Sequence, residues 1–413
     1  MDFVKGIKKE FSFVRGNYAV MVLSWILVDF AAEIPAAYYI LYVLNLGATE
    51  TIAGLIGLSQ FLALASMQFP GGYLTDKFGR KWIISSMTFG VALSFVLFAL
   101  APSWEYILIG AVLMGLCNST YQPALMAMIA DSLPPEKRGM GFGIVTLIAS
   151  ASTTPAPIVA VFLCNTYGLV NGMRVGYGIV VALFLVAAGM RSFLLKETVV
   201  TTERPRLSDL LSSYPAALRE GVGVWKRLPR SLLYLSLTLL IVQFGFASVN
   251  IYMPDYATNV LHLDKTVWGL MIAIMPVTTI IAAIPIGKTV DKTNRKTPLL
   301  LSLLLFGSAI WLFAYGQFIA LFASLIIVGA AQVMLNTAYG AMQADMTPRD
   351  DRGKVNGFTN FAGYIVMATG SFLGGLFYEH FSPQLPFMIA AASVLPAFAL
   401  ALLLVHEPKK RED

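Results

Sequence analysis

The chain has 413 residues, of which 57% are hydrophobic and only 13% are charged, and its mean hydropathy is +0.72. Soluble domains carry roughly a quarter charged residues, so this composition excludes a globular protein surrounded by water and requires lipid. The net charge of +6 does not indicate a nucleic-acid partner, because the basic residues form short clusters between long apolar runs.

Apolar runs long enough to cross a bilayer recur along the whole chain. A helix needs about 20 residues to cross a hydrocarbon core of about 30 Å. The first run is longer than a signal-peptide core and has no small-residue cleavage site, so we expect it to be retained. The sequence predicts an all-α membrane protein with twelve transmembrane spans, at 17–45, 51–75, 82–101, 104–131, 138–166, 171–195, 230–258, 266–290, 297–316, 318–345, 353–380 and 385–405.

The distribution of basic residues predicts the orientation. With the N-terminus in the cytoplasm, only Arg174 and Lys265 of the 29 Lys and Arg residues fall near the outer side. Cytoplasmic loops of membrane proteins carry an excess of Lys and Arg. We therefore expect a multi-pass protein of the cell membrane (inner or plasma membrane) with both termini in the cytoplasm.

One connection differs from the others. Residues 197–229 are polar and basic, and Leu210, Leu211, Tyr214 and Leu218 follow a plausible N-cap at Ser208 with helical spacing. We predict an amphipathic surface helix there that links the two halves of the chain. The expected division is a first six-helix bundle at 1–196, a cytoplasmic linker at 197–229 and a second bundle at 230–413.

Two charged motifs occur once in each half. Gly72 lies at the end of span two, and Asp76 and Arg80 follow it. Asp291 and Arg295 follow span eight with the spacing of Asp76 and Arg80. A second motif follows spans four and ten and contains Asp131, Arg138, Asp345 and Arg352. The interval from Asp76 to Asp291 equals that from Asp131 to Asp345 to within a single position. Two independent motifs that repeat at one interval indicate duplicated halves. The twelve helices should therefore form two pseudo-symmetric six-helix bundles.

Residues 72–81 match every fixed position of the pattern G-x-L-x-D-[RK]-x-G-R-[RK], and the chain thereby resembles the major facilitator superfamily (MFS) of transporters, in particular its drug/proton antiporter-like branch. The resemblance extends over essentially the whole chain. It implies two halves that rock about a central cavity and expose a midplane site to each side of the membrane in turn.

The charged motifs predict a gate on the cytoplasmic side. Gly72 has no side chain and would let span two approach a neighbouring helix closely. The resemblance places Asp76 near the N-terminus of span eleven, where the helix dipole favours a carboxylate. Arg80 can pair with Asp131. The complete predicted gate comprises Gly72, Asp76, Arg80, Asp131 and Arg138 in the first half and Asp291, Arg295, Asp345 and Arg352 in the second. Alternatively, these loops are basic membrane anchors.

Two carboxylates lie within the first span. Asp29 and Glu33 are four residues apart and share one helical face. Counted from Tyr18, they lie roughly 16 and 22 Å into the membrane core. Charges at this depth are costly and normally face a partner or a water-filled cavity. We predict that the pair carries protons or binds a cation, and the alternative is a structural carboxylate pair bonded to neighbouring helices.

Uncharged polar residues form a candidate substrate cavity. They lie at intervals in spans four, seven and ten: Asn118, Tyr121, Gln122, Gln243, Asn250, Gln332 and Asn336. Buried amides also bridge helices, so each of these residues has a structural alternative. The many aromatic residues suit an amphipathic solute, although aromatics are also ordinary constituents of membrane helices.

Transport driven by a gradient is the function that these features favour. The chain has three histidines without metal-ligand spacing and no phosphate-binding G-x-x-x-x-G-K-[ST] loop, so we expect no enzymatic activity, no metal and no cofactor.

Span five contains Pro155 and Pro157 but lacks the paired glycines of drug/proton antiporters. Proton-coupled export of drug-like or amphipathic compounds is the leading hypothesis, with the proton gradient as energy source. The alternatives are a symporter or uniporter for a metabolite or inorganic cation, and a membrane solute sensor. We expect a monomer whose partners are the lipid bilayer and a small-molecule or ion substrate.

Overall fold

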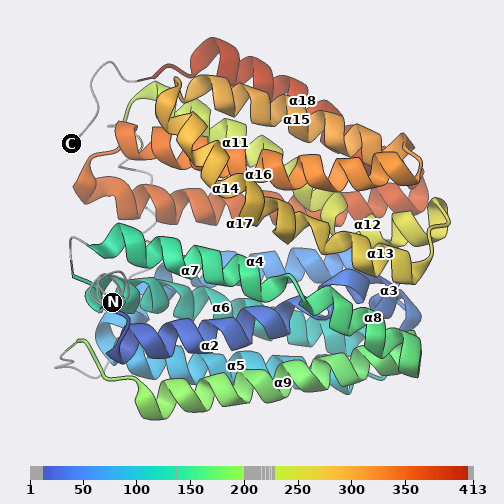
Figure 1. Ribbon diagram of the computed structural model, residues 1–413, viewed down its shortest axis with the longest axis horizontal. Coiled ribbons are helices and arrows are strands. Elements are labelled where there is room, and N and C mark those ends of the chain that lie inside the picture. The colour runs from blue at the N-terminus through green and yellow to red at the C-terminus, as the bar shows by residue number, and fades with distance from the viewer. Residues whose placement is uncertain are drawn as a thin grey trace, which may run out of the picture.

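The computed structural model describes residues 13–134, 137–199, 215, 219, 223, 225 and 228–407. In this part of the chain all regular structure is helical, and the long helices run side by side along one direction (Figure 1). Eleven of the described helical segments are long and apolar enough to cross a membrane. The twelfth, α6 (Trp104–Asp131), has 28 residues and packs against α4 and α5, and polar residues between Asn118 and Gln122 lower its hydropathy. The predicted twelve-helix fold is confirmed.

The first six spans are formed by α2 to α9. Their bounds are α2 (Gly16–Glu33) with η1 (Ala36–Tyr38) and α3 (Tyr39–Asn45), α4 (Glu50–Phe78), α5 (Arg80–Ala99), α6, α7 (Arg138–Thr153) with α8 (Ala156–Tyr167), and α9 (Leu169–Leu194). Each begins and ends within a few residues of the predicted span, because the change from apolar to charged or turn-forming residues is abrupt at both ends.

The second six spans repeat this order. They comprise α11 (Arg230–Asn250) with α12 (Met253–Asp255) and the π-helix η3 (Tyr256–Val260), α13 (Lys265–Ile272) with α14 (Ile274–Lys292), α15 (Lys296–Tyr315), α16 (Phe318–Met346), the short η4 (Arg349–Asp351) with α17 (Arg352–His380), and α18 (Leu385–Leu404). In Figure 1 these helices lie together above α2 to α9, and α4 and α17 form the most extensive contact between the two groups.

Prolines interrupt two spans of the first half. α2 ends before Pro35, and a short 3-10 segment then leads into α3. The span 138–167 is split at Thr154 and Pro155 into α7 and α8, at the first of the two prolines in that span. Proline lacks the backbone donor that a continuous helix needs, so the chain can change direction at these points.

The two ends of the bundle differ in charge, because many basic residues lie at one end and Arg174 and Lys265 lie toward the other. The first end carries Arg80, Lys81, Lys292, Arg295, Lys296 and Arg352. The basic end is the one at which α4, α6, α14 and α16 finish with Phe78, Asp131, Lys292 and Met346, and the opposite end carries the turns at Gly47, Gly168 and Gly316. Except for a few isolated positions, the surface helix predicted within 197–229 lies outside the described residues. The predicted division at 196 and 230 stays a prediction.

Candidate functional site

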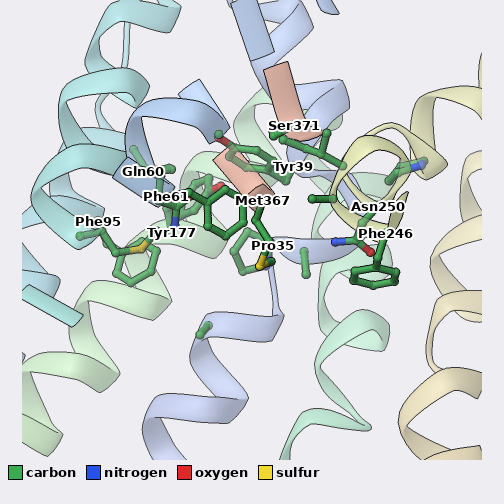
Figure 2. A pocket seen from close by; sticks show the side chains of 18 residues that line it. Pro35, Tyr39, Gln60, Phe61, Phe95, Tyr177, Phe246, Asn250, Met367 and Ser371 are labelled. Carbon is green, nitrogen blue, oxygen red and sulfur yellow. The ribbon is translucent and has the colours of Figure 1, made fainter. Parts of the chain in front are cut away.

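A cavity of about 310 Å³ lies between the two groups of helices. Figure 2 shows that rings from both groups surround it, with Tyr39, Phe61 and Tyr177 from the first and Phe246 from the second. Other apolar walls come from Phe95, Phe98, Met114, Ile251 and Met367. This volume and this mainly apolar lining are typical of sites that bind small organic molecules.

The polar groups of the central cavity are few and uncharged. Gln60 of α4, Asn250 of α11 and Ser371 of α17 contribute amide and hydroxyl groups. Among its described lining residues none is charged. A solute bound here therefore meets ring faces and a small number of hydrogen-bonding groups. Asn250 is one of the residues that the sequence predicted for the cavity.

A second cavity of about 200 Å³ lies within the second group of helices and is lined by Gln243, Gln332 and Asn336. Phe246 and Met367 line both cavities, so the two are neighbours. Four of the seven residues predicted for the substrate cavity thus line one of these two cavities.

The remaining three predicted cavity residues belong to α6 and are not among the lining residues of either cavity. Asn118 is half-buried and Gln122 is exposed, while Tyr121 is buried against other helices of the first half. Gln332 and Asn336 occupy the positions in the second half that correspond to Asn118 and Gln122, so the repeat places equivalent amides at different kinds of sites.

Asp29 and Glu33 lie on α2, directly before the turn that contributes Ala32, Pro35 and Ala36 to the central cavity. Both carboxylates are half-buried, and neither is among the lining residues of the cavity. Asp29 faces Trp25, one turn earlier on the same helix. The carboxylates are thus beside the cavity rather than within its wall.

Arg191 of α9 is a buried charge that the sequence analysis did not single out. Its side chain is 1% exposed. The guanidinium donates hydrogen bonds to the hydroxyl oxygens of Ser24 (3.0 Å) and Thr88 (2.7 Å) and lies 5.8 Å from the centroid of the Tyr121 ring. A signal was present in the sequence: Arg191 lies inside the predicted span 171–195, while Lys196 already provides a basic residue at its end.

The two groups of helices are joined by hydrogen bonds at the opposite end of the bundle. The Tyr38 hydroxyl donates to the carbonyl oxygen of Lys265 (2.7 Å), and the Trp268 indole donates to that of Ala37 (3.0 Å). The backbone N–H of Thr51 donates to the Glu379 carboxylate at 2.9 Å. In Figure 1, α13 lies close to α8 at this end, and the two helices are in contact. These contacts hold the two groups of helices together at the opposite end.

At the basic end, the predicted ion pairs Arg80–Asp131 and Arg295–Asp345 are both present. Arg80 begins α5 and Asp131 ends α6, so the first pair joins these two helices of the first half. Its counterpart joins the start of α15 to α16 in the second half. Arg352 donates to the carbonyl oxygens of Thr347 and Ala344. Each of these interactions stays within one half, and none of them connects the two halves.

The predicted packing role of Gly72 is wrong. A Cβ atom added at Gly72 would meet nothing within 4 Å, whereas one added at Gly71 would lie 2.8 Å from the carbonyl oxygen of Ser119. Gly71 is therefore the residue that lets α4 approach α6, because the two positions face about 100° apart on the helix. The side chains of Asp76, Arg138 and Asp291 lie outside the described part of the structure.

Comparison with known protein families decides the class of this protein. The family model of the Major Facilitator Superfamily matches residues 18–265 and 235–413. The chain belongs to the major facilitator superfamily. It is thus a transporter-family protein whose members move small molecules or ions across membranes, as the motif at residues 72–81 indicated.

Curated relatives carry two kinds of name. Multidrug resistance protein 1 of Bacillus subtilis is 31% identical over 187 residues, which is 43% of this chain and 47% of that relative. Multidrug resistance protein MdtG of Salmonella schwarzengrund is 24% identical over 402 residues, or 92% and 93% of the two chains. A Na(+), Li(+), K(+)/H(+) antiporter of Planococcus maritimus is 26% identical over 334 residues, or 70% and 75%.

Solved structures share the fold. The nucleoside transporter NupG superimposes with a TM-score of 0.76 over 94% of this chain and 99% of its own, at 13% sequence identity. This likeness supports the arrangement of the helices and leaves the solute open.

Proposed function

We propose that this protein is a secondary active transporter that exports drug-like or amphipathic compounds in exchange for protons. The observation that carries the proposal is the cavity between the two halves, which is walled by aromatic rings and has uncharged polar groups. Ring faces attract flat organic molecules, and they also attract organic cations through the ring quadrupole. Such a wall binds many compounds of this class without a fixed pattern of hydrogen bonds.

The coupling ion is assigned to the carboxylates of α2. Asp29 and Glu33 lie beside the cavity on the helix that forms part of its wall, and they are half-buried. Asp255, another carboxylate inside the bundle, accepts hydrogen bonds from Tyr378 (2.7 Å) and Asn259 (2.6 Å) and is 3% exposed. Both carboxylate oxygens of Asp255 are thus engaged within the protein, which supports the assignment of the proton carriers to Asp29 and Glu33.

Relatives named as multidrug resistance proteins support this proposal. The relative named as an antiporter of Na(+), Li(+), K(+) and H(+) favours a second candidate, the exchange of an inorganic cation for protons. Both candidates use a proton gradient, but they differ in cargo. An inorganic cation needs oxygen ligands, and the two carboxylates of α2 would then bind the cation as well as the proton.

The experiment that separates these candidates uses proteoliposomes with an imposed pH gradient. Ethidium flux is followed by the fluorescence of DNA trapped in the lumen, and Na⁺, Li⁺ and K⁺ are added separately while a lumenal pH dye is recorded. Flux of ethidium that stops when the pH gradient is collapsed supports drug/proton exchange. Dissipation of the gradient by the inorganic cations supports the second candidate. If the flux of ethidium ignores the pH gradient and none of the three inorganic cations dissipates it, proton coupling is contradicted.

A further inference from the structure

Arg191 presents a charge inside a membrane-spanning bundle, away from the ion pairs of the basic end. It lies three residues before the end of α9, and its side chain extends to Ser24 of α2 and Thr88 of α5. Each of those residues is about 12 Å along its helix from the basic end, at 1.5 Å per residue. The guanidinium thus lies well inside the bundle rather than at its surface, and a charge there is costly unless something compensates it.

The immediate contacts of Arg191 are neutral. The hydroxyl protons of Ser24 and Thr88 are donated to the carbonyl oxygens of Met21 and Ile84, so both hydroxyl oxygens are free to accept from the guanidinium. The Tyr121 ring adds a cation–π contact. These groups solvate the guanidinium but supply no negative charge. Among the described residues no carboxylate forms an ion pair with it.

The carboxylate that can compensate Arg191 is Asp29. It lies on α2, five residues and thus about 7.5 Å along the helix axis beyond Ser24, whose hydroxyl accepts a hydrogen bond from the Arg191 guanidinium. This placement puts the carboxyl group within electrostatic range of Arg191 and of Tyr121. The other ionisable groups around this site are Glu33 of α2, together with Tyr121 and Cys117 of α6. α5 after Lys81 and α7 after Arg138 carry no charged residue. Asp29 and Arg191 are therefore opposite charges that form no ion pair in this structure and interact at a distance through the low-dielectric interior of the bundle.

We propose that Arg191 is the internal counter-charge of Asp29 and enables that carboxyl group to release its proton during the transport cycle. With Asp29 ionised, the two charges balance inside the bundle. When Asp29 takes up a proton, the charge of Arg191 is left uncompensated, and the protonated state is disfavoured. Because Arg191 bonds to α2 and α5 and contacts α6, this change acts on four helices of the first half. The inference rests on the proton-coupled transport proposed above.

The direct test measures protonation rather than transport. The infrared band of a protonated carboxyl group is followed during pH titration of the full-length protein, and subtraction of the Asp29→Asn variant isolates the signal of Asp29. In the Arg191→Gln variant the midpoint of this band is expected to move upward by about 1 pH unit or more, because an opposite charge nearby favours the ionised carboxylate.

Two matched variants separate charge from hydrogen bonding. Arg191→Lys keeps the positive charge and is expected to keep the midpoint of the unmodified protein. Thr88→Val removes one acceptor of the guanidinium but leaves the charge in place, and is also expected to show no shift. An Arg191→Gln variant that folds and titrates with the unmodified midpoint overturns the proposal, as does a shift of equal size in Thr88→Val.

If Arg191→Gln does not fold, the double variant Asp29→Asn/Arg191→Gln decides the question. Removal of both charges is expected to give a higher thermal midpoint than removal of Arg191 alone. The reason is that the effects of two substitutions on stability do not add when the two charges compensate each other. A double variant that is no more stable than Arg191→Gln overturns the proposal. Failure of the proposed function is distinguishable, since it appears as proteoliposome flux that ignores the pH gradient in the unmodified protein.

Discussion

Tyr42 and Tyr256 occupy corresponding positions in the two halves of the protein and make the same hydrogen bond in each. The Tyr42 hydroxyl donates to the carbonyl oxygen of Phe98 at 2.8 Å, and the Tyr256 hydroxyl donates to that of Ala314 at 2.7 Å. Each bond ties the end of one broken span to the end of a neighbouring helix. The duplication seen in the charged motifs therefore extends to the buried contacts at the opposite end of the bundle.

This equivalence predicts equal and independent contributions to stability. Tyr42→Phe and Tyr256→Phe should each lower the free energy of unfolding by about 1 kcal/mol, because each leaves a buried carbonyl without its partner. The double variant should lose the sum, since the sites lie in different halves. Thermal unfolding in detergent measures the effect, and Tyr315→Phe, at an exposed tyrosine, is the matched control. A double variant that loses much more than the sum would contradict independence of the two sites.

The carboxylates of α2 are expected to be needed for coupling but not for folding. Asp29→Asn combined with Glu33→Gln should abolish flux driven by a pH gradient and leave the elution profile and thermal midpoint close to those of the unmodified protein. The reason is that amides keep the shape of the side chain but cannot take up and release a proton. The matched control is Glu105→Gln, at a carboxylate in the first turn of α6 at the opposite end of the bundle. Unchanged flux in the double variant would reassign the pair as structural.

Closure of the opposite end can be tested by cross-linking. The side chains of Asn165 and Thr266 come from different halves and approach to 3.3 Å. A double cysteine variant at these positions, with Cys117 and Cys164 replaced by Ser, should form a disulfide readily. Adding Tyr38→Phe and Trp268→Phe removes the two hydrogen bonds that join the halves nearby. Cross-linking should then slow several-fold, and an unchanged rate would show that these two bonds do not hold this end closed.

Asp76 is expected to hold the two halves together at the basic end. The resemblance places Asp76 near the N-terminus of span eleven, which is α17, and the helix dipole favours a negative charge there. The Asp76→Asn variant removes that charge, so conformations open at the basic end should become more populated. Spin labels on cysteines introduced at Met140 of α7 and Thr289 of α14 report the distance between the halves. A distance distribution that does not lengthen would remove Asp76 from the gate.

The helices were predictable because the signal for them is local. A run of apolar residues between charged clusters fixes a membrane span within a few residues, and the repeat of the charged motifs was enough to predict the pairing of Arg80 with Asp131 and its counterpart in the second half. The membrane spans follow from residues that are neighbours in the sequence, and the two ion pairs follow from a repeated pattern. The α6 span was also recognised, although its amides reduce its hydropathy below that of the other helices.

The site was predicted less completely because cavities depend on bends and rotations that sequence spacing does not fix. Gln243, Asn250, Gln332 and Asn336 line cavities, but Tyr121 packs against Arg191 instead. Arg191 lies inside the predicted span 171–195, but its direction into the bundle could not be predicted, since it depends on two hydroxyl acceptors from distant helices. A rotation of about 100° between adjacent positions likewise separates Gly71 from Gly72.

The repeat has one more consequence, which concerns electrical balance. Gln243 occupies the position in the second half that corresponds to Asp29, and it lines the second cavity, so the second half carries a neutral amide where the first carries an acid. In the proposed cycle proton uptake takes place at the two acids of α2, and the second half has no acid at the position that corresponds to Asp29. One proton exchanged for one monovalent organic cation moves no net charge, whereas two protons make each cycle move one charge inward. The membrane voltage would then drive export only if both Asp29 and Glu33 exchange protons in the same cycle.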